Sequence, residues 1–115
     1  MQVLVVDDEP EIRHILASYL GVEGYQVTTA ADGAEALACI ERDSPSLVVL
    51  DMRMPVMDGW DFAREVHNRG LDVPIMVMTA AGDAQRCAEE IRASSYVSKP
   101  VNLRQLIEKV DRLCA

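Results

Sequence analysis

The sequence predicts a single α/β domain built on a mostly parallel sheet, and three observations indicate this fold class. Short apolar runs alternate with amphipathic stretches along the whole chain, which is typical of strands that alternate with helices. Residues 47–50 form an uninterrupted apolar run, as expected of a strand that helices cover on both faces. The length of 115 residues suits one domain with one core, so we expect residues 1–115 to form a single domain without an output domain.

The first part of the chain predicts two strands and two helices. Apolar residues 3–6 predict the first strand, which the polar residues 7–10 end. The next stretch predicts a helix, because its apolar residues recur at helical spacing. This stripe comprises Ile12, Ile15, Leu16, Tyr19 and Leu20. Residues 25–30 alternate like an edge strand, and Asp32-Gly33 turns the chain into a second helix.

The rest of the chain predicts three more strands and three more helices. After the strand at 47–50, Pro55 and Asp58-Gly59 predict a loop, because proline cannot continue a ladder and Asp-Gly favours a turn. Strands are predicted at 75–78 and 96–97, between helices with apolar residues at helical spacing. These helices carry Trp60, Ala63, Val66 and His67, then Ala84, Cys87, Ala88 and Ile91, and finally Leu103, Leu106, Ile107, Val110 and Leu113.

Polar residues follow several of the predicted strands and should meet at one edge of the sheet. We expect right-handed crossovers and a flavodoxin-like strand order of 2-1-3-4-5. In such open sheets, ligands bind at the carboxyl ends of the strands. The residues at these ends are Asp7, Asp8, Asp51, Thr79 and Lys99. Their convergence predicts a functional site.

The residue types at this edge indicate phosphoryl chemistry supported by a divalent cation. Three carboxylates at one partly buried point repel each other, so they need raised pKa values or a cation. Mg²⁺ or Mn²⁺ is expected, because Mg²⁺ prefers oxygen ligands and keeps several waters. Asp51 is the candidate nucleophile toward phosphorus, with the ammonium of Lys99 and the hydroxyl of Thr79 beside it.

These residues resemble the receiver domain of bacterial two-component response regulators, and the resemblance spans the whole chain. The stretch from Asp51 to Gly59 is similar to the phosphoacceptor loop of that family, with Pro55 four places after the aspartate. The resemblance implies that Asp51 accepts a phosphoryl group from a histidine kinase or a phosphotransfer protein. It also assigns magnesium binding to Asp7, Asp8, Asp51 and the backbone carbonyl of Arg53, with no organic cofactor.

The same resemblance implies how the domain signals. Thr79 and Lys99 would contact the phosphoryl group, and Tyr96 matches the aromatic switch residue of the family. The Lys-Pro bond of that family is typically cis, and Lys99-Pro100 is the corresponding bond in this chain. Phosphorylation would then change the face of the fourth helix, fifth strand and fifth helix. Such a domain catalyses its own phosphorylation and dephosphorylation but is a signalling switch rather than a turnover enzyme.

Three features depart from the family pattern. Thr79 and Lys99 are 99 − 79 = 20 residues apart, which indicates a short or shifted fourth helix. Residues 92–95 stand where the family usually has a turn that contains glycine. Arg53 and Ala81 occupy two positions that tune the lifetime of the phosphoryl group in this family. We hypothesise that Arg53 alters the attack of water on the acyl phosphate.

Composition restricts the partners and the location of the chain. A formal charge of −8 argues against direct binding to nucleic acid, because it repels a phosphate backbone. No apolar run is long enough for a membrane span and no signal peptide is evident, so we expect a cytoplasmic protein. The three cysteines lack the spacing of metal ligands and are expected to pack in the core. Output would pass to a downstream protein, to an output domain outside this sequence, or through a phosphorylation-dependent homodimer.

Two other functions compete with this interpretation. A phosphatase of the haloacid dehalogenase type also uses a nucleophilic aspartate, but it needs a second aspartate where this chain has Arg53. A binding module that does not take phosphate is the other alternative. The presence of the acidic pair, Asp51, Thr79 and Lys99 together argues against it. Motifs for dinucleotides and for a Walker phosphate loop are absent from the sequence.

Overall fold

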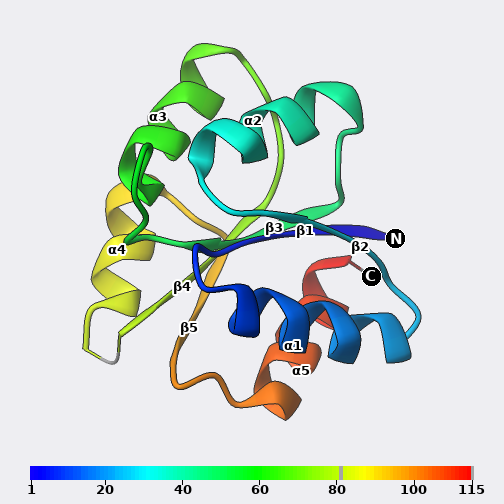
Figure 1. The fold of residues 1–115 in the computed structure, drawn as a ribbon. Coiled ribbons are helices and arrows are strands. Elements are labelled where there is room, and N and C mark those ends of the chain that lie inside the picture. Colours follow the sequence, from blue (N-terminus) through cyan, green and yellow to red (C-terminus); the bar gives the residue numbers. More distant parts are fainter. Residues whose placement is uncertain (81, 115) are drawn as a thin grey trace.

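Strands and helices alternate along the chain in the computed structural model, which describes residues 1–80 and 82–114 (Figure 1). The strands are β1 (Gln2–Val6), β2 (Gln26–Ala30), β3 (Leu47–Asp51), β4 (Ile75–Ala80) and β5 (Ser95–Lys99). The helices are α1 (Pro10–Val22), α2 (Gly33–Arg42), α3 (Gly59–Asn68), α4 (Ala84–Ile91) and α5 (Leu103–Cys114). Every predicted element is therefore present, and β5 is longer than the predicted residues 96–97.

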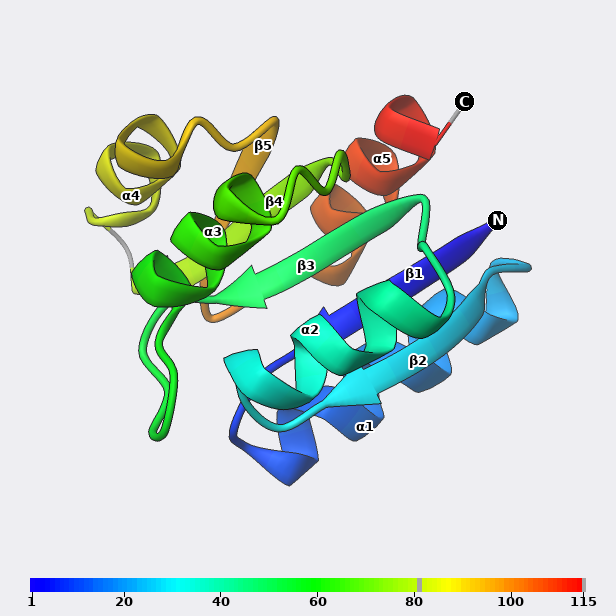
Figure 2. The same cartoon turned by 90° about the horizontal axis from the view of Figure 1, so that it is seen from above.

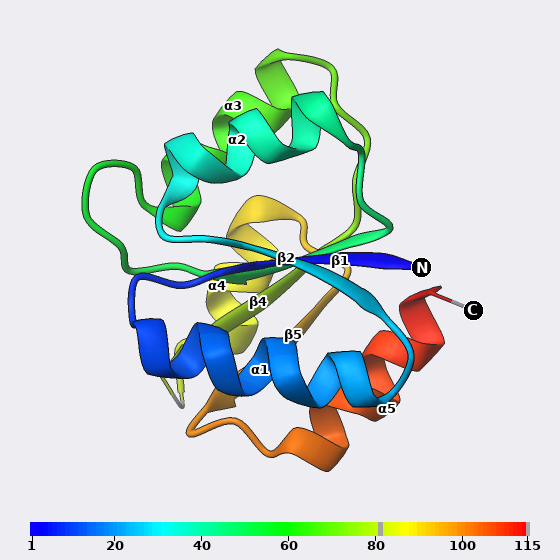
Figure 3. The same cartoon turned by 45° about the vertical axis from the view of Figure 1, so that its right-hand side comes forward.

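The strands form one parallel sheet in the order β2-β1-β3-β4-β5, which confirms the predicted topology. Helices α2, α3 and α4 pack on one face of this sheet, and α1 and α5 pack on the other. Figures 2 and 3 show this three-layer arrangement from above and from the side. Because β1 and β3 are adjacent, the strand order reverses between them, and their carboxyl ends flank the point where such folds bind ligands.

Burial of β3 on both faces explains its uninterrupted apolar sequence. All five of its residues are buried. Val48 and Leu50 belong to the core beneath α2, α3 and α4, whereas Leu47 and Val49 belong to the core above α1 and α5. This alternation follows from the two-residue period of a strand. The strand that ends at Asp51 is therefore held from both sides.

The apolar stripe predicted for α1 is only partly buried. Leu16 and Leu20 are fully buried against the sheet, but the side chains of Ile15 and Tyr19 are 51% and 37% exposed. Leu16 and Leu20 lie four residues apart, so they project from the same line of the helix surface. The helix contacts the sheet along this narrow line, and Ile15 and Tyr19 lie at its margin.

Adjacent residues define the start of three helices, two of them through a side-chain cap. Pro10 occupies the first turn of α1, where its missing N–H costs no hydrogen bond. The carboxylates of Asp32 and Asp58 accept hydrogen bonds of 2.9 Å from the backbone N–H groups of Glu35 and Asp61. These caps determine where α2 and α3 begin.

The described helices include none that is long and apolar enough to cross a membrane. The three cysteines are free and buried, as predicted for packing residues. Helix α4 has 8 residues, which agrees with the short helix indicated by the spacing between Thr79 and Lys99.

Arg92 ends α4 in a conformation that glycine adopts more easily. Its φ of 56° and ψ of 44° lie in the left-handed region, and the next amide, Ala93 N–H, donates a 2.8 Å hydrogen bond to Ala88 O. This geometry is a common way to end a helix, usually with glycine at the left-handed position. Arg92 therefore stands in the place of the glycine that the resemblance led us to expect in this turn.

Replacing Arg92 with glycine should stabilise the protein. We expect Arg92→Gly to raise the free energy of unfolding by about 1 kcal/mol, because glycine has no Cβ to strain at positive φ. Urea unfolding measures the change. Arg92→Ala is the control, since it also removes the side chain but keeps the Cβ. Equal stabilities of the two variants would contradict the prediction.

Candidate functional site

The register of the sheet brings the predicted site residues to one edge. Val6 pairs with Leu50, so Asp7 and Asp51 follow at the same level on neighbouring strands. On the other side, Asp51 pairs with Met78, which places Thr79 one residue further along β4. Lys99 is the last residue of β5 and pairs with Ala80. The predicted convergence at the carboxyl ends of β1, β3, β4 and β5 is therefore confirmed.

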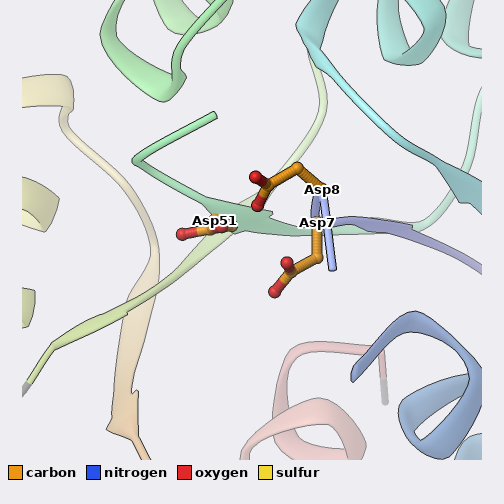
Figure 4. Close-up of side chains that lie close together, drawn as sticks. All are labelled: Asp7, Asp8 and Asp51. Carbon is orange, nitrogen blue, oxygen red and sulfur yellow. The ribbon is translucent and has the colours of Figure 1, made fainter. Parts of the chain in front are cut away.

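Three carboxylates meet at this edge. Asp7, Asp8 and Asp51 each offer a carboxylate oxygen, and the three oxygens lie within 4.8 Å of one another. Figure 4 shows Asp7 and Asp8 at the end of β1 beside Asp51 at the end of β3. Asp7 is fully buried and Asp51 is 4% exposed. Two of the three negative charges are thus withdrawn from water, which is costly without nearby cations.

Lys99 supplies positive charge to this cluster. Its Nζ lies 3.0 Å from Asp7 Oδ2 and 3.5 Å from Asp51 Oδ2. A third carboxylate, Glu9 Oε1, lies 3.6 Å away on the solvent side. Burial would lower the pKa of Lys99, but the close contact with the Asp7 carboxylate and the charges of Asp51, Asp7 and Glu9 outweigh burial and raise it. The ammonium therefore stays charged in the site.

Asp51 titrates well above an ordinary aspartate. Burial and the charge of Asp7 raise its pKa from the usual 3.8 to about 6, although Lys99 and the backbone N–H of Arg53 oppose the rise. That N–H donates to Asp51 Oδ1 over 3.3 Å. At neutral pH the carboxylate is mostly ionised, as a nucleophile must be, but it remains energetically unfavourable in its folded environment.

The donor set at this edge fits a hard divalent cation. Asp7 Oδ2 is buried and, among the described residues, has no hydrogen-bond partner of good geometry, although it faces the Lys99 ammonium. A single lysine cannot neutralise three clustered carboxylates. All of the clustered donor atoms are carboxylate oxygens, which suit Mg²⁺ or Mn²⁺ rather than a metal that prefers sulfur. Asp7, Asp8 and Asp51 could therefore hold such an ion.

The loop after Asp51 packs closely against the first residues of α2 and α3, which are both glycines. Gly59 N–H donates to Met52 O over 2.9 Å, and Gly33 N–H donates to Met57 O over 3.2 Å. A Cβ on Gly59 would lie 2.7 Å from the Cα of Met52, and one on Gly33 would lie 2.7 Å from Met57 Cγ. Glycine is needed at both positions because the loop backbone and side chains occupy this space.

Two loops have unusual backbone geometry, and the first of them agrees with the family resemblance. The Lys99-Pro100 peptide bond is cis. At the tip of the loop that follows Asp51, Val56 has a φ of 69° and is 85% exposed. Met57 N–H donates to Pro55 O across it, over 2.8 Å. Val56 is thus the centre of a tight turn that a β-branched residue seldom adopts.

Thr79 lies at the carboxyl edge of the sheet, whereas Tyr96 lies further from that edge on β5. Thr79 is 2% exposed and lies at the edge of the sheet where the carboxylates meet. Tyr96 pairs with Val77, is half-buried and packs against the core beneath α4. Lys109 of α5 donates to the backbone oxygen of Tyr96 and places its Nζ 4.7 Å from the centre of the ring. Tyr96 therefore connects β5 with α5, on the side of the sheet expected to signal.

The structure adds two residues that the sequence did not assign to the site. Glu9 lies among the polar residues 7–10 that end the first strand, and its carboxylate faces Lys99. Arg13 Nη1 donates to the backbone oxygen of Asp7 over 2.7 Å. Arg13 follows Glu9 by four residues, a spacing that places both on one side of α1. The spacing did not indicate that the guanidinium of Arg13 would reach the backbone of Asp7. Ala81, the other position linked to phosphoryl lifetime, lies outside the described residues.

Comparison with known proteins defines the class to which this fold and site belong. Residues 3–111 match the response regulator receiver domain, and the chain belongs to that family. Receiver domains are the switch modules of two-component signalling, and they bind Mg²⁺ in an acidic pocket. The predicted family and fold are both confirmed.

Particular relatives show the same relationship. The chain is 44% identical over 114 residues to a probable transcriptional regulator ycf27 of Cyanophora paradoxa, covering 97% of this chain and 47% of the relative. It is 38% identical over 115 residues to the response regulator MprA of Mycobacterium leprae, covering 98% of this chain and 50% of the relative. The chain thus spans about half the length of these curated relatives.

Solved structures agree with the fold. The chemotaxis protein CheY4 of Vibrio cholerae superposes with a TM-score of 0.87 at 32% identity, covering 97% of each chain. The receiver domain of NtrX from Brucella abortus superposes with a TM-score of 0.88 at 32% identity, also covering 97% of each chain.

A methyl group on Gly59 should disturb the loop that carries Asp51. We expect Gly59→Ala to lower the free energy of unfolding by roughly 1–3 kcal/mol, because the new Cβ would meet the backbone of Met52. Thermal or urea unfolding measures the loss. Gly21→Ala is the matched control: Gly21 is helical, a Cβ there meets nothing within 4 Å, and alanine should stabilise α1 by about 0.5–1 kcal/mol. A neutral Gly59→Ala would contradict the close approach.

The raised pKa of Asp51 predicts how stability depends on pH in metal-free solution. The folded state binds a proton at Asp51 more tightly than the unfolded state, so the free energy of unfolding falls as the pH rises from about 4 to about 6. Asp51→Asn removes this penalty and should be more stable than the wild type by on the order of 2 kcal/mol at neutral pH. The gain should disappear toward pH 4.

Urea unfolding in chelator over a series of pH values tests this linkage. Asp72→Asn, at an exposed position before β4, is the control for loss of one negative charge and should show no such trend. A stability difference between wild type and Asp51→Asn that stays constant across the pH series would refute the assigned shift.

Proposed function

We propose that the chain is a phosphorylation switch in which Asp51 accepts a phosphoryl group from a histidine kinase or a phosphotransfer protein. The observation that carries this proposal is the position of Lys99 Nζ, 3.5 Å from Asp51 Oδ2 and 3.0 Å from Asp7 Oδ2. A cation held beside a buried nucleophile can neutralise charge on a transferring phosphoryl group. The haloacid dehalogenase alternative lacks its second aspartate, since Arg53 stands there.

In the transfer step, a carboxylate oxygen of Asp51 attacks the phosphorus of a phosphohistidine. The O–P bond forms while the P–N bond breaks, and the electron pair of that bond goes to the imidazole nitrogen, which then takes up a proton. Asp51 must be ionised to attack, and a pKa of about 6 allows this at neutral pH. The hydrogen bond from Arg53 N–H to Oδ1 orients the carboxylate so that the other oxygen is free to react.

Magnesium or manganese would be held by Asp7, Asp8 and Asp51, with the backbone carbonyl of Arg53 as a further ligand by family resemblance. The buried Oδ2 of Asp7 and the clustered carboxylates support these assignments. When bound, the ion supplies positive charge that offsets the carboxylates and the transferring group. Glu9 and Arg13 hold the start of α1 near this cluster, through Lys99 and the backbone of Asp7 respectively.

After transfer, Lys99 and the hydroxyl of Thr79 contact the phosphoryl oxygens. Contacts that form only in the phosphorylated state shift the population toward the arrangement in which they are made. Tyr96 and the face formed by α4, β5 and α5 then present a different surface to a partner. The effect of Arg53 on the lifetime of the acyl phosphate stays a prediction, tested by timing dephosphorylation of Arg53→Ala.

Output passes from this face to another protein, to an output domain or to a second copy of the chain. Some curated relatives are named transcriptional regulators and are about twice as long as this chain. We infer that this chain serves as the receiving half of such a system and acts in the cytoplasm. With a formal charge of −8, it would influence nucleic acid through a partner rather than bind it directly.

Phosphorylation of Asp51 can be measured directly by intact mass after incubation with acetyl phosphate. We expect the wild type to gain one phosphoryl group when Mg²⁺ is present and none in chelator. Asp51→Asn should gain none under either condition. Lys99→Ala should gain it at least about tenfold more slowly, because the ammonium beside Asp51 is lost.

Three outcomes have clear meanings. A gain that requires both Mg²⁺ and Asp51 supports the proposal. A gain that persists in Asp51→Asn would assign the phosphoacceptor to another residue. A folded wild type that never gains mass would identify a binding module that works without phosphate.

A further inference from the structure

Helix α4 is attached to the sheet by small side chains. Its buried residues are Ala84, Cys87 and Ala88, and Ile91 is half-buried. Helix α5, by comparison, buries Leu106, Ile107, Val110 and Cys114. Small side chains bury little apolar area, so packing holds α4 less firmly than α5. Polar contacts between α4 and its neighbours therefore have a larger share in positioning it.

One such contact begins two residues after the phosphoacceptor. Arg53 Nη2 lies 3.7 Å from Asp83 Oδ2 at the start of α4. The guanidinium carbon of Arg53 also lies 5.6 Å from the ring centre of Trp60, in the first turn of α3. Arg53 thus joins the beginning of α3 to the beginning of α4, through a cation–π contact on one side and an ion pair on the other.

Trp60 continues this connection to the far end of α4. Its Nε1 donates to Glu90 Oε1 over 3.3 Å, and Glu90 lies in the last turn of the helix. Arg53, Trp60, Asp83 and Glu90 will be called the α4 tether. The α4 tether contacts the first and the last turn of α4. It starts from Arg53, in the loop that follows Asp51.

Asp83 forms the tether in place of a helix cap. The aspartates that precede α2 and α3, Asp32 and Asp58, cap those helices through their carboxylates. Asp83 occupies the same position before α4, but its side chain makes no cap hydrogen bond. Its Oδ1 instead accepts from Arg86 over 2.9 Å, while Oδ2 faces Arg53. The start of α4 is therefore tied to Arg53 rather than capped by its own aspartate.

We propose that Arg53 is the positioning residue through which the phosphorylation state of Asp51 is transmitted to α4, by release of the α4 tether. This proposal rests on the proposed function, since it requires phosphorylation of Asp51. In the unphosphorylated protein, Asp83 and Trp60 hold the guanidinium. The phosphoryl group on Asp51 competes for it and draws it away from both.

Charge and proximity make this competition effective. A phosphorylated Asp51 carries roughly two negative charges where the carboxylate carried one, and it adds three strong acceptor oxygens. The backbone N–H of Arg53 already contacts Asp51 Oδ1, so the base of its side chain is next to the new group. Arg53, Asp8 and Trp60 line one surface hollow of about 400 Å³, which leaves room for the guanidinium to turn. Its side chain is 62% exposed and is not locked by packing.

The experiment combines two readouts with the intact mass as a record of phosphorylation. Trp60 is the single tryptophan of the chain, so intrinsic fluorescence reports its contact with Arg53. Hydrogen exchange followed by mass spectrometry reports the opening of α4. The wild type, Arg53→Gln and Arg64→Ala are compared with and without acetyl phosphate and Mg²⁺. Arg64→Ala is the matched control, because Arg64 is an exposed arginine of α3 whose ion pair is with Asp61.

In the wild type and in Arg64→Ala, phosphorylation should change the fluorescence and speed exchange in α4 on the order of threefold. Unphosphorylated Arg53→Gln should already show the fluorescence and exchange of the phosphorylated wild type, and phosphorylation should add little. If Arg53→Gln gains the phosphoryl group yet responds like the wild type, the tether proposal is overturned while the proposed function stands. If the wild type itself gains no mass, both are overturned.

Discussion

The ion pair between Lys99 and the buried carboxylates of Asp7 and Asp51 is the interaction on which the rest of the site depends. Charges that leave water lose their hydration, and a partner at short distance must compensate for that loss. Lys99 approaches Asp7 to 3.0 Å and Asp51 to 3.5 Å, but one ammonium facing three clustered aspartates leaves an excess of negative charge. Burial and the charge of Asp7 together raise the pKa of Asp51, and the excess of negative charge suits the site to a divalent cation.

The fold can tolerate the electrostatic cost of this cluster because helices cover both faces of the strands that carry it. Residues of β1 and β3 reach into both cores, and Val6, the last residue of β1, pairs with Leu50, one residue before the end of β3. A destabilising cluster at their carboxyl ends is then supported by the burial of many apolar side chains. The electrostatic cost lies at the edge of the sheet, where ligands bind and water can enter, and not in the core.

Receiver domains bind Mg²⁺ in an acidic pocket, and in this chain a residue next to that pocket reaches helix α4. In this chain, the position two residues after Asp51 carries an arginine, which contacts Asp83 and Trp60. Helix α4 is short and buries small side chains, so contacts of this kind have a large effect on its position. Arg92 ends the helix at a positive φ without glycine, which adds local strain at its other end. The region between β4 and β5 therefore combines small buried side chains with polar contacts to Arg53 and Trp60.

The sequence by itself determined the order of the elements, the class of fold and the principal candidates for the site. Apolar runs such as residues 47–50 are typical of a strand that is covered on both faces, and a parallel sheet brings the ends of such strands to one edge. For that reason the sequence could predict the site residues Asp7, Asp51, Thr79 and Lys99. The turns at Asp32-Gly33 and Asp58-Gly59 were predicted from adjacent residues alone, and the structure adds that both aspartates cap the helices that follow.

Tertiary structure decided which long side chains pair across elements and which apolar residues are buried. Local periodicity placed Ile15 and Leu16 on one stripe, but the narrow contact of α1 with the sheet buries Leu16 and exposes Ile15. Glu9 faces Lys99, and Trp60 reaches Glu90 across 30 positions of sequence. Flexible side chains have many rotamers, so the partner they select depends on distances between packed elements, which sequence spacing does not specify.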